Sequence, residues 1–178
     1  MKQLTFAMLL MLTTTLVSGQ ITRNRVFSLP GSDEKKRIEV IDKILISKKD
    51  SAELYVERGQ LVMTLNVNEP SQQFVKRTNA QALSDIDRGI SLRPAKPEFY
   101  KIKADYFFYV HDDFPSAIQN MSKAIQLDST NCAFYQRRAM LYFKNNDKDS
   151  ACKDWNKCAV LNCKEAEGCV SFVNDYCK

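Results

Sequence analysis

The residues of this chain best suited to specific chemistry are six cysteines, all of which lie after residue 131. Thiolates bind zinc or act as redox pairs, and both roles favour two cysteines separated by two residues. No pair here has that spacing, whereas an even number of cysteines indicates disulfides if the chain enters an oxidising compartment, for which the N-terminus gives evidence below. We therefore expect three disulfides and keep a metal or redox role as the alternative. The cysteines are Cys132, Cys152, Cys158, Cys163, Cys169 and Cys177.

The second candidate for chemistry is the sequence His111-Asp112-Asp113, which contains the only histidine of the chain. One imidazole and two carboxylates can bind a cation or transfer protons. Adjacent residues at a helix end point in different directions, however, and Asp113 stands two residues before Pro115, as expected of a residue that caps a helix. We therefore expect a helix boundary here, no metal and no cofactor. A metal-binding or enzymatic protein centred on His111 remains the alternative.

The rest of the sequence carries no motif of catalysis or of nucleic-acid binding. It has no glycine-rich phosphate loop and no nucleophile motif, so we predict that the protein is not an enzyme. The 178 residues are 44% hydrophobic and 26% charged with a net charge of +5, a composition typical of a folded domain. Its longest basic cluster, 35–37, has acidic neighbours and no interleaved aromatic residues, which argues against nucleic-acid binding.

The N-terminus has the pattern of a targeting segment. Lys2 precedes an apolar run from Leu4 to Leu12, and the small pair Ser18-Gly19 follows. We predict a signal peptide over 1–19 and an N-terminal extension over 20–33, with an uncleaved anchor as the alternative. The protein is then exported, to the periplasm, the cell surface or the medium. No later segment approaches the roughly 20 apolar residues of a membrane span, so we expect none in the mature chain.

An internal repeat indicates how these residues are positioned. Small residues at 82, 117 and 151 are 35 and 34 residues apart, and each begins a similar apolar pattern. Upstream of each, a tyrosine is followed four residues later by a small residue, as in Tyr100 with Ala104. Residues four apart share one helical face, and a small residue there lets a second helix approach closely. Turn residues separate the segments and no proline falls inside one, so we predict an all-α protein of antiparallel helix pairs.

These motifs resemble the tetratricopeptide repeat family. The resemblance covers roughly Glu34 to Leu161 and rests on three units in phase, since single units of this family are degenerate. It implies a right-handed helical-repeat solenoid of about three repeats, at 52–94, 97–129 and 132–163, within a domain at 34–178. The stretch from Ala151 to Ala166 is similar to the last repeat of exported repeat proteins of Bacteroidetes-type bacteria. The carriers are Tyr55 with Arg58-Gly59, Tyr100 with Ala104, Tyr135 with Arg138-Ala139, and the second-helix endings at 90–94 and 124–128.

The chain departs from the family pattern in the first repeat and at both ends. A polar stretch at 66–79 containing Pro70 is expected to be an exposed loop inserted between the two helices of the first repeat. Residues 34–47, with apolar side chains at helical spacing, are expected to cap the solenoid at one end. Residues 164–178 are expected to cap it at the other, with Val170, Val173 and Phe172 packed inward, because each repeat buries its apolar face only against a neighbour. The apolar residues of the first cap are Ile38, Ile41, Ile44 and Leu45.

On this proposed fold the disulfide pairing can be narrowed. Two of the cysteines, at 132 and 163, stand at opposite ends of the last helix pair, where antiparallel helices meet. Another two, at 152 and 177, stand at matching ends of the second helix and the cap, with those at 158 and 169 between them. The predicted pairs are Cys132–Cys163, Cys152–Cys177 and Cys158–Cys169.

The resemblance also implies a function, which is the binding of a peptide or partner protein on the inner face formed by the first helix of each repeat. Aromatic and Met side chains there suit adaptable contacts, although each could instead belong to the core between repeats. An alternative is a structural subunit of a cell-envelope assembly that makes contact through its convex face and the inserted loop. The oligomeric state does not follow from these patterns. The predicted partner-binding residues are Gln60, Met63, Lys101, Asp105, Phe108, Tyr109, Gln136, Met140 and Phe143, with Val56 on the same stripe.

Overall fold

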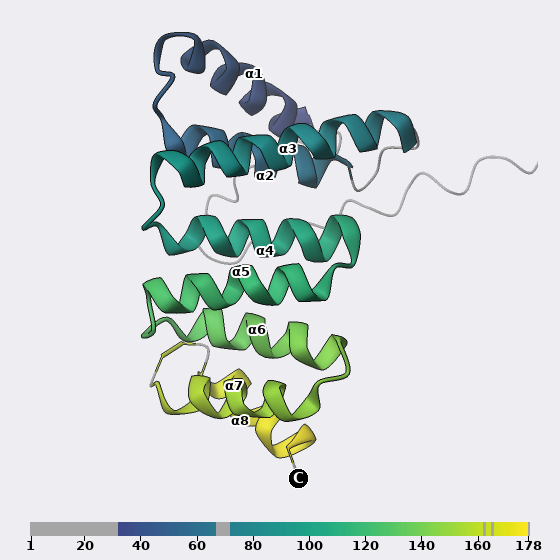
Figure 1. The fold of residues 1–178 in the computed structure, drawn as a ribbon, viewed down its shortest axis with the longest axis vertical. Helices are drawn as coiled ribbons and strands as arrows, with labels where there is room; N and C mark the ends of the chain where they lie inside the picture. The colour runs from purple at the N-terminus through teal and green to yellow at the C-terminus, as the bar shows by residue number, and fades with distance from the viewer. Residues whose placement is uncertain (1–31, 67–71, 162, 165, 178) are drawn as a thin grey trace, which may run out of the picture.

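A computed structural model describes residues 32–66, 72–161, 163–164 and 166–177, and the predicted signal peptide and most of the N-terminal extension lie outside these residues. The described part contains eight α-helices and no β-strand. The helices stack in chain order along the long axis of the molecule (Figure 1). Their bounds are α1 Ser32–Ser47, α2 Ala52–Asn66, α3 Gln72–Leu92, α4 Pro97–His111, α5 Phe114–Leu127, α6 Cys132–Lys144, α7 Lys148–Val160 and α8 Ala166–Tyr176.

The helices pair as α2 with α3, α4 with α5 and α6 with α7, which confirms the predicted repeat of helix pairs. Capping side chains define where several helices begin. Asp113 accepts a hydrogen bond from the Ser116 backbone N–H at the start of α5, and Asp147 accepts one from the Ser150 backbone N–H at the start of α7. Hydrogen bonds from the side chains of Ser116 and Ser150, together with those from their backbone N–H groups, lower the pKa of both carboxyls, because they stabilise the charged form. The sequence His111-Asp112-Asp113 is therefore the boundary between α4 and α5.

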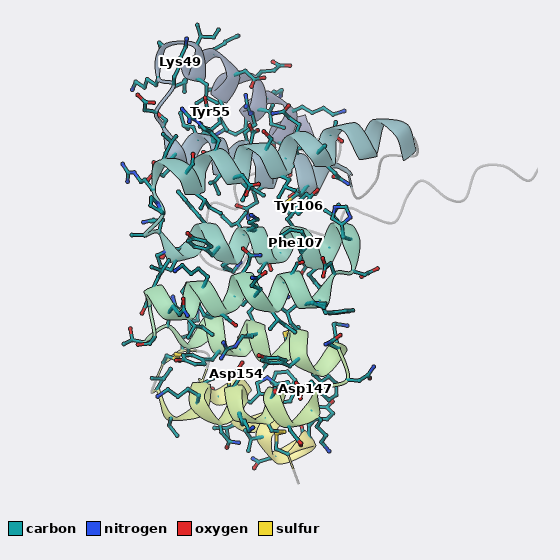
Figure 2. The ribbon with its side chains drawn as sticks, in the orientation of Figure 1. Lys49, Tyr55, Tyr106, Phe107, Asp147 and Asp154 are labelled. Carbon is teal, nitrogen blue, oxygen red and sulfur yellow. A yellow bond between two sulfur atoms is a disulfide. The ribbon has the colours of Figure 1, made fainter. Side chains whose placement is uncertain are left out.

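The core follows the small and large residues of the repeat pattern. One continuous cluster runs from Ala104 in α4 through Met121 and Trp155 to Cys169 in α8. A second cluster joins α3 to α4, where the Tyr106 side chain points from α4 toward α3 and is 2% exposed (Figure 2). Each repeat thus buries its apolar face against the next, and the stack has no separate domains within the described residues.

Two glycines set the close approach of α2 and α3. A Cβ atom on Gly59 would lie 2.7 Å from the backbone oxygen of Ala82, and one on Gly89 would overlap Val56. The equivalent positions in the second repeat are Ala104 and Ala124. The first helix pair therefore has no room for the methyl groups that the second accepts.

The predicted loop at 66–79 is wrong over most of its length. The helix α2 extends to Asn66 and α3 begins at Gln72, so residues 72–79 form the first two turns of α3 and only 67–71 lie between the helices. The polar composition of this stretch is typical of a loop. Glutamine, lysine, arginine and alanine are good helix formers, however, and no proline or glycine lies between Gln72 and Arg88.

The two capping helices are present, with one error in the burial predicted for them. In α1, Ile41 and Leu45 are buried, as expected of a helix that covers the first repeat. In α8, Phe172 and Val173 pack against the core, but Val170 is 46% exposed. The cap buries Cys169 instead, because the disulfide of this residue to α7 fixes which side of α8 faces inward.

Three disulfides join the C-terminal helices in the predicted pairs. Their Cα–Cα distances are 6.5 Å for Cys132–Cys163, 5.6 Å for Cys152–Cys177 and 6.0 Å for Cys158–Cys169. Such a set is typical of proteins that reside in an oxidising compartment. Among the described helices, none is both long and apolar enough to cross a membrane.

Candidate partner-binding face

The candidate face is built from the first helices of the repeats, α2, α4 and α6. Lysine, aspartate and aromatic side chains recur on one side of α4 at Lys101, Asp105, Phe108 and Tyr109, since residues three and four apart share a helical face. On α2, Gln60 is exposed and Met63 is half-buried against the second core cluster. Val56 is 2% exposed and belongs to the core, so its predicted place on the binding face is wrong.

Arg137, which has no distinctive signal in the sequence, organises the centre of this face. It reaches from α6 to α4, where its Nε donates a hydrogen bond of 2.8 Å to Asp105 Oδ1. Lys101 Nζ donates to the other carboxylate oxygen, Oδ2, also at 2.8 Å. One carboxylate thus receives a cation from its own helix and one from the next repeat, which fixes α4 and α6 relative to each other.

Two aromatic rings cover the Arg137 guanidinium. Its central carbon lies 4.9 Å from the ring centroid of Phe108 and 5.1 Å from that of Tyr109. The two rings meet edge to face with centroids 4.7 Å apart. These distances are those of cation–π contacts, which hold the cation and both rings in place. We call Lys101, Asp105, Phe108, Tyr109 and Arg137 the Arg137 cluster.

The Arg137 cluster combines a partly buried ion pair with an exposed aromatic ring. The side chains of Asp105 and Arg137 are only 16% and 15% exposed, whereas Tyr109 is 66% exposed. Arg137 Nη2 lies 2.6 Å from Asp105 Oδ1 but is not aligned for a hydrogen bond, so its contribution there is an ion pair. A large ring is therefore presented to solvent on a rigid, charge-paired support.

The remaining predicted residues lie on α6, beyond the Arg137 cluster. Gln136 approaches α8, because its Nε2 would be 3.2 Å from a Cβ atom on Gly168, and Met140 is half-buried. Phe143 is 39% exposed and its ring packs against those of Trp155 and Tyr176, at 5.6 and 5.0 Å. Phe143 is thus part of an aromatic cluster at the C-terminal cap, and its contacts with two rings leave it only partly available to a partner.

The alternative site at His111 has the character of a helix end. His111 Nε2 lies 3.1 Å from the hydroxyl of Tyr106, whose pKa burial raises. Within the described residues, no group of three or more His, Cys, Asp or Glu side chains is arranged to hold a metal ion.

A cleft between α4 and α5 is a second feature without a signal in the sequence. Its volume is about 590 Å³, and its lining residues are mostly polar. Tyr100, Lys103 and Phe107 lie roughly opposite the Arg137 cluster around the axis of α4, because each residue of a helix turns by about 100°. The lining residues are Tyr100, Lys103, Phe107, Ser116, Gln119, Asn120, Ser122, Lys123 and Gln126.

No protein-family model matches the sequence, and no curated protein matches it. Among solved structures, the chain is similar to TTC0263, a thermophilic TPR protein of Thermus thermophilus, with a TM-score of 0.67, 14% identity, and coverage of 77% of this chain and 70% of that one. It is also similar to MamA (41 to the end) of Desulfovibrio magneticus RS-1, with a TM-score of 0.61, 17% identity, and coverage of 72% and 66%. At these identities the likeness is one of fold.

Proposed function

We propose that this chain, which has the fold of tetratricopeptide repeat proteins, is an exported, non-catalytic interaction module that binds a peptide or partner protein through the Arg137 cluster. The observation that carries the proposal is the exposed ring of Tyr109 on a partly buried, ion-paired arginine. The three disulfides support export, because they form in oxidising compartments.

The composition of the Arg137 cluster is that of a binding hot spot. Tyrosine and arginine are enriched at positions where truncation costs a complex about 2 kcal/mol or more, and such residues are usually surrounded by contacts that exclude water. Tyr109 has only two rotatable side-chain bonds, and its contact with Arg137 already restricts them. Burying the ring against a partner therefore costs little side-chain entropy.

The charge of the face favours a partner with carbonyl or carboxylate groups beside an apolar side chain. Lys101 and Arg137 share the single carboxylate of Asp105, which leaves the cluster with one net positive charge. The Lys101 side chain is 38% exposed and has further donor hydrogens for a partner. Gln60 and Gln136 add amide groups suited to the backbone of an extended or helical segment.

The proposal is tested by site-directed photocrosslinking in the compartment where the chain resides. A photoreactive phenylalanine analogue at position 109 should capture one specific protein, and Arg137→Ala should abolish capture because the support of the ring is lost. Val160 offers the control position, since it is 75% exposed on the second helix of the last repeat. Capture from position 160 and none from 109 would refute the proposal and favour contact through the second helices, as in an envelope assembly.

The captured protein then permits a quantitative test. Tyr109→Ala should weaken its binding, measured by calorimetry with purified proteins, by roughly 30-fold or more, which corresponds to about 2 kcal/mol. Because Tyr109 is mostly exposed, the variant should lose no more than about 1 kcal/mol of stability, the value of an exposed cation–π contact, and should stay folded. Unchanged affinity in this folded variant would contradict the assignment of Tyr109 as the anchor.

A further inference from the structure

The three repeats place a basic residue at the same position, three residues after the marker tyrosine. In the first repeat this residue is Arg58, which donates two hydrogen bonds of 2.7 Å to Asp85 on the second helix of the pair. In the third repeat it is Arg138, which donates bonds of 2.7 and 2.8 Å to Asp154. These bonds to the carboxylates raise the pKa of both arginines. A pair between a partly buried arginine and a buried aspartate thus joins the two helices in both repeats.

The second repeat has the cation but lacks the carboxylate. Its basic residue is Lys103, and Asn120 occupies the position that corresponds to Asp85 and Asp154, three residues after the small residue of the second helix. The Asn120 amide donates a hydrogen bond of 2.8 Å to the backbone oxygen of Ser116 on its own helix.

Lys103 is therefore paired on one side only. Its Nζ lies 2.7 Å from Asp87 Oδ1 on α3, the helix that precedes α4. The basic residues of the first and third repeats also contact the preceding helix: Arg58 pairs with Asp42 on α1, and Arg138 donates to Ser122 on α5. In those repeats the basic residue is held from both sides, whereas in the second repeat the α5 side supplies no carboxylate.

The cleft between α4 and α5 lies at the place of the missing pair. Lys103 and Asn120 both line it, together with the rings of Tyr100 and Phe107 (Figure 2 shows Phe107 on α4 and Asp154 on α7). No aspartate or glutamate is among the lining residues. Lys123 adds a second cation, which forms no ion pair within the part of the chain that the structure describes. With Asp87 counted against Lys103, the two lysines leave one net positive charge at the cleft, with apolar rings beside it.

We propose that this cleft binds an acidic segment of a partner protein, one carboxylate of which takes the place beside Lys103 that Asp85 and Asp154 fill in the other repeats. The lining extends along α5 from Ser116 to Gln126, about 15 Å at 1.5 Å per residue. That length accommodates about four or five extended residues and exceeds a single small carboxylate. Lys103 and Lys123 would each receive one carboxylate, and the amides of Gln119 and Gln126 lie beside the path of the peptide backbone.

The decisive variant is Asn120→Asp, which supplies the missing carboxylate from within the chain. We expect the new side chain to pair with Lys103, as in the other two repeats, and to repel an acidic ligand. The probe is an end-blocked hexaglutamate peptide, with hexaglutamine as its neutral counterpart, and binding is measured by fluorescence anisotropy at low and moderate salt. Wild type should bind hexaglutamate only, and more weakly as the salt rises.

Asn120→Asp and Lys103→Met should each weaken hexaglutamate binding about tenfold or more, the loss expected for one charge-assisted hydrogen bond. The control is Lys157→Met, which removes one exposed positive charge from α7 outside the cleft and should change affinity less than about twofold. Thermal unfolding checks the fold. In Asn120→Asp the lost hydrogen bond to the Ser116 backbone oxygen offsets part of the gain from pairing with Lys103, so we expect an unfolding temperature close to that of wild type, and lost binding by the folded variant then cannot be ascribed to unfolding.

Several outcomes would overturn the proposal. Equal losses in Lys103→Met and Lys157→Met would mean that only net charge attracts the peptide, and wild-type binding by Asn120→Asp would mean that the cleft is not used. Binding of an oligogalacturonate but not of hexaglutamate would replace the peptide by an acidic sugar. The test is independent of the proposed function, because Asn120→Asp leaves the Arg137 cluster intact and photocrosslinking from position 109 should persist.

Discussion

Replacing Cys158 and Cys169 by alanine should destabilise the C-terminal end of the protein more than replacing Cys152 and Cys177, although the second disulfide closes the longer loop. The sequence separations are 11 and 25 residues. Chain entropy alone then assigns about 2.8 kcal/mol to the first disulfide and about 3.5 kcal/mol to the second. On loop length alone, removal of Cys152–Cys177 would cost more.

Burial reverses this order. Cys158 and Cys169 are 0% exposed, whereas Cys152 and Cys177 are both half-buried. Each alanine at a buried position removes a sulfur atom from a packed core and leaves a small void, at a cost of about 1 kcal/mol per site. We therefore expect a loss of about 5 kcal/mol for the buried pair and about 3.5 to 4 kcal/mol for the half-buried pair.

The assay is urea unfolding under non-reducing conditions, followed by fluorescence. The protein contains one tryptophan, Trp155 on α7, whose ring stacks on Phe172 of α8 at 5.0 Å, so its emission reports the region that both disulfides join. Far-UV circular dichroism follows the other helices, because repeat proteins can unfold in parts. If the half-buried pair proves equally or more costly to remove, the argument from burial is wrong.

Three further predictions concern packing, ion pairs and pH. Gly59→Ala should lower the free energy of unfolding by about 1 kcal/mol, because the clash of the new methyl group with the Ala82 backbone oxygen on α3 outweighs the gain in helix propensity. An unchanged or higher unfolding temperature would contradict the close approach of α2 and α3. Arg138→Lys removes a bidentate pair and should lower the free energy of unfolding, measured with urea, by about 1 to 3 kcal/mol. The same change at the more exposed Arg37 should lower it by less than about 1 kcal/mol, and equal losses would refute the role of burial. The lowered pKa values of Asp113 and Asp147 mean that both carboxylates stabilise the fold above the ordinary carboxyl range, and this stabilisation is lost as the pH falls below about 4. In the variant with Asn at both positions the caps remain but do not titrate, so its free energy of unfolding should fall less steeply with acid. Parallel curves for the variant and wild type would exclude this contribution.

The sequence by itself determined the order of the helices, their pairing and the disulfide framework, but not where α3 begins. Periodicity shows which residues share a helical face, and a repeat near 34 residues shows that the pairs stack in register. The ends of antiparallel helices meet whatever the details of packing, and the pairing of Cys132 with Cys163 needs no more than that. Local signals also located the helix start at Asp113, because a capping bond spans only three residues.

Sequence patterns failed at the start of α3 and in the orientation of α8. The stretch at 72–79 has a polar composition, yet it extends α3 because its residues favour helix. Val170 fits an inward-facing stripe, yet it is exposed, because the disulfide at Cys169 fixes the rotation of α8. A periodic pattern defines a face of a helix, but it does not specify the angle at which that face meets the next helix.

Only the tertiary structure decided how residues of different repeats combine at the sites. In the sequence, nothing distinguishes Arg137 from other charged residues. Its place in the cluster depends on a hydrogen bond between α6 and Asp105 on α4. The cleft at Lys103 lies where Asn120 takes the place of the aspartates of the other two repeats, and this difference has no meaning until the arginine–aspartate pairs of those repeats are seen. Distances between helices arise from the packing of all side chains together, so they cannot be read from the spacing of residues along one helix.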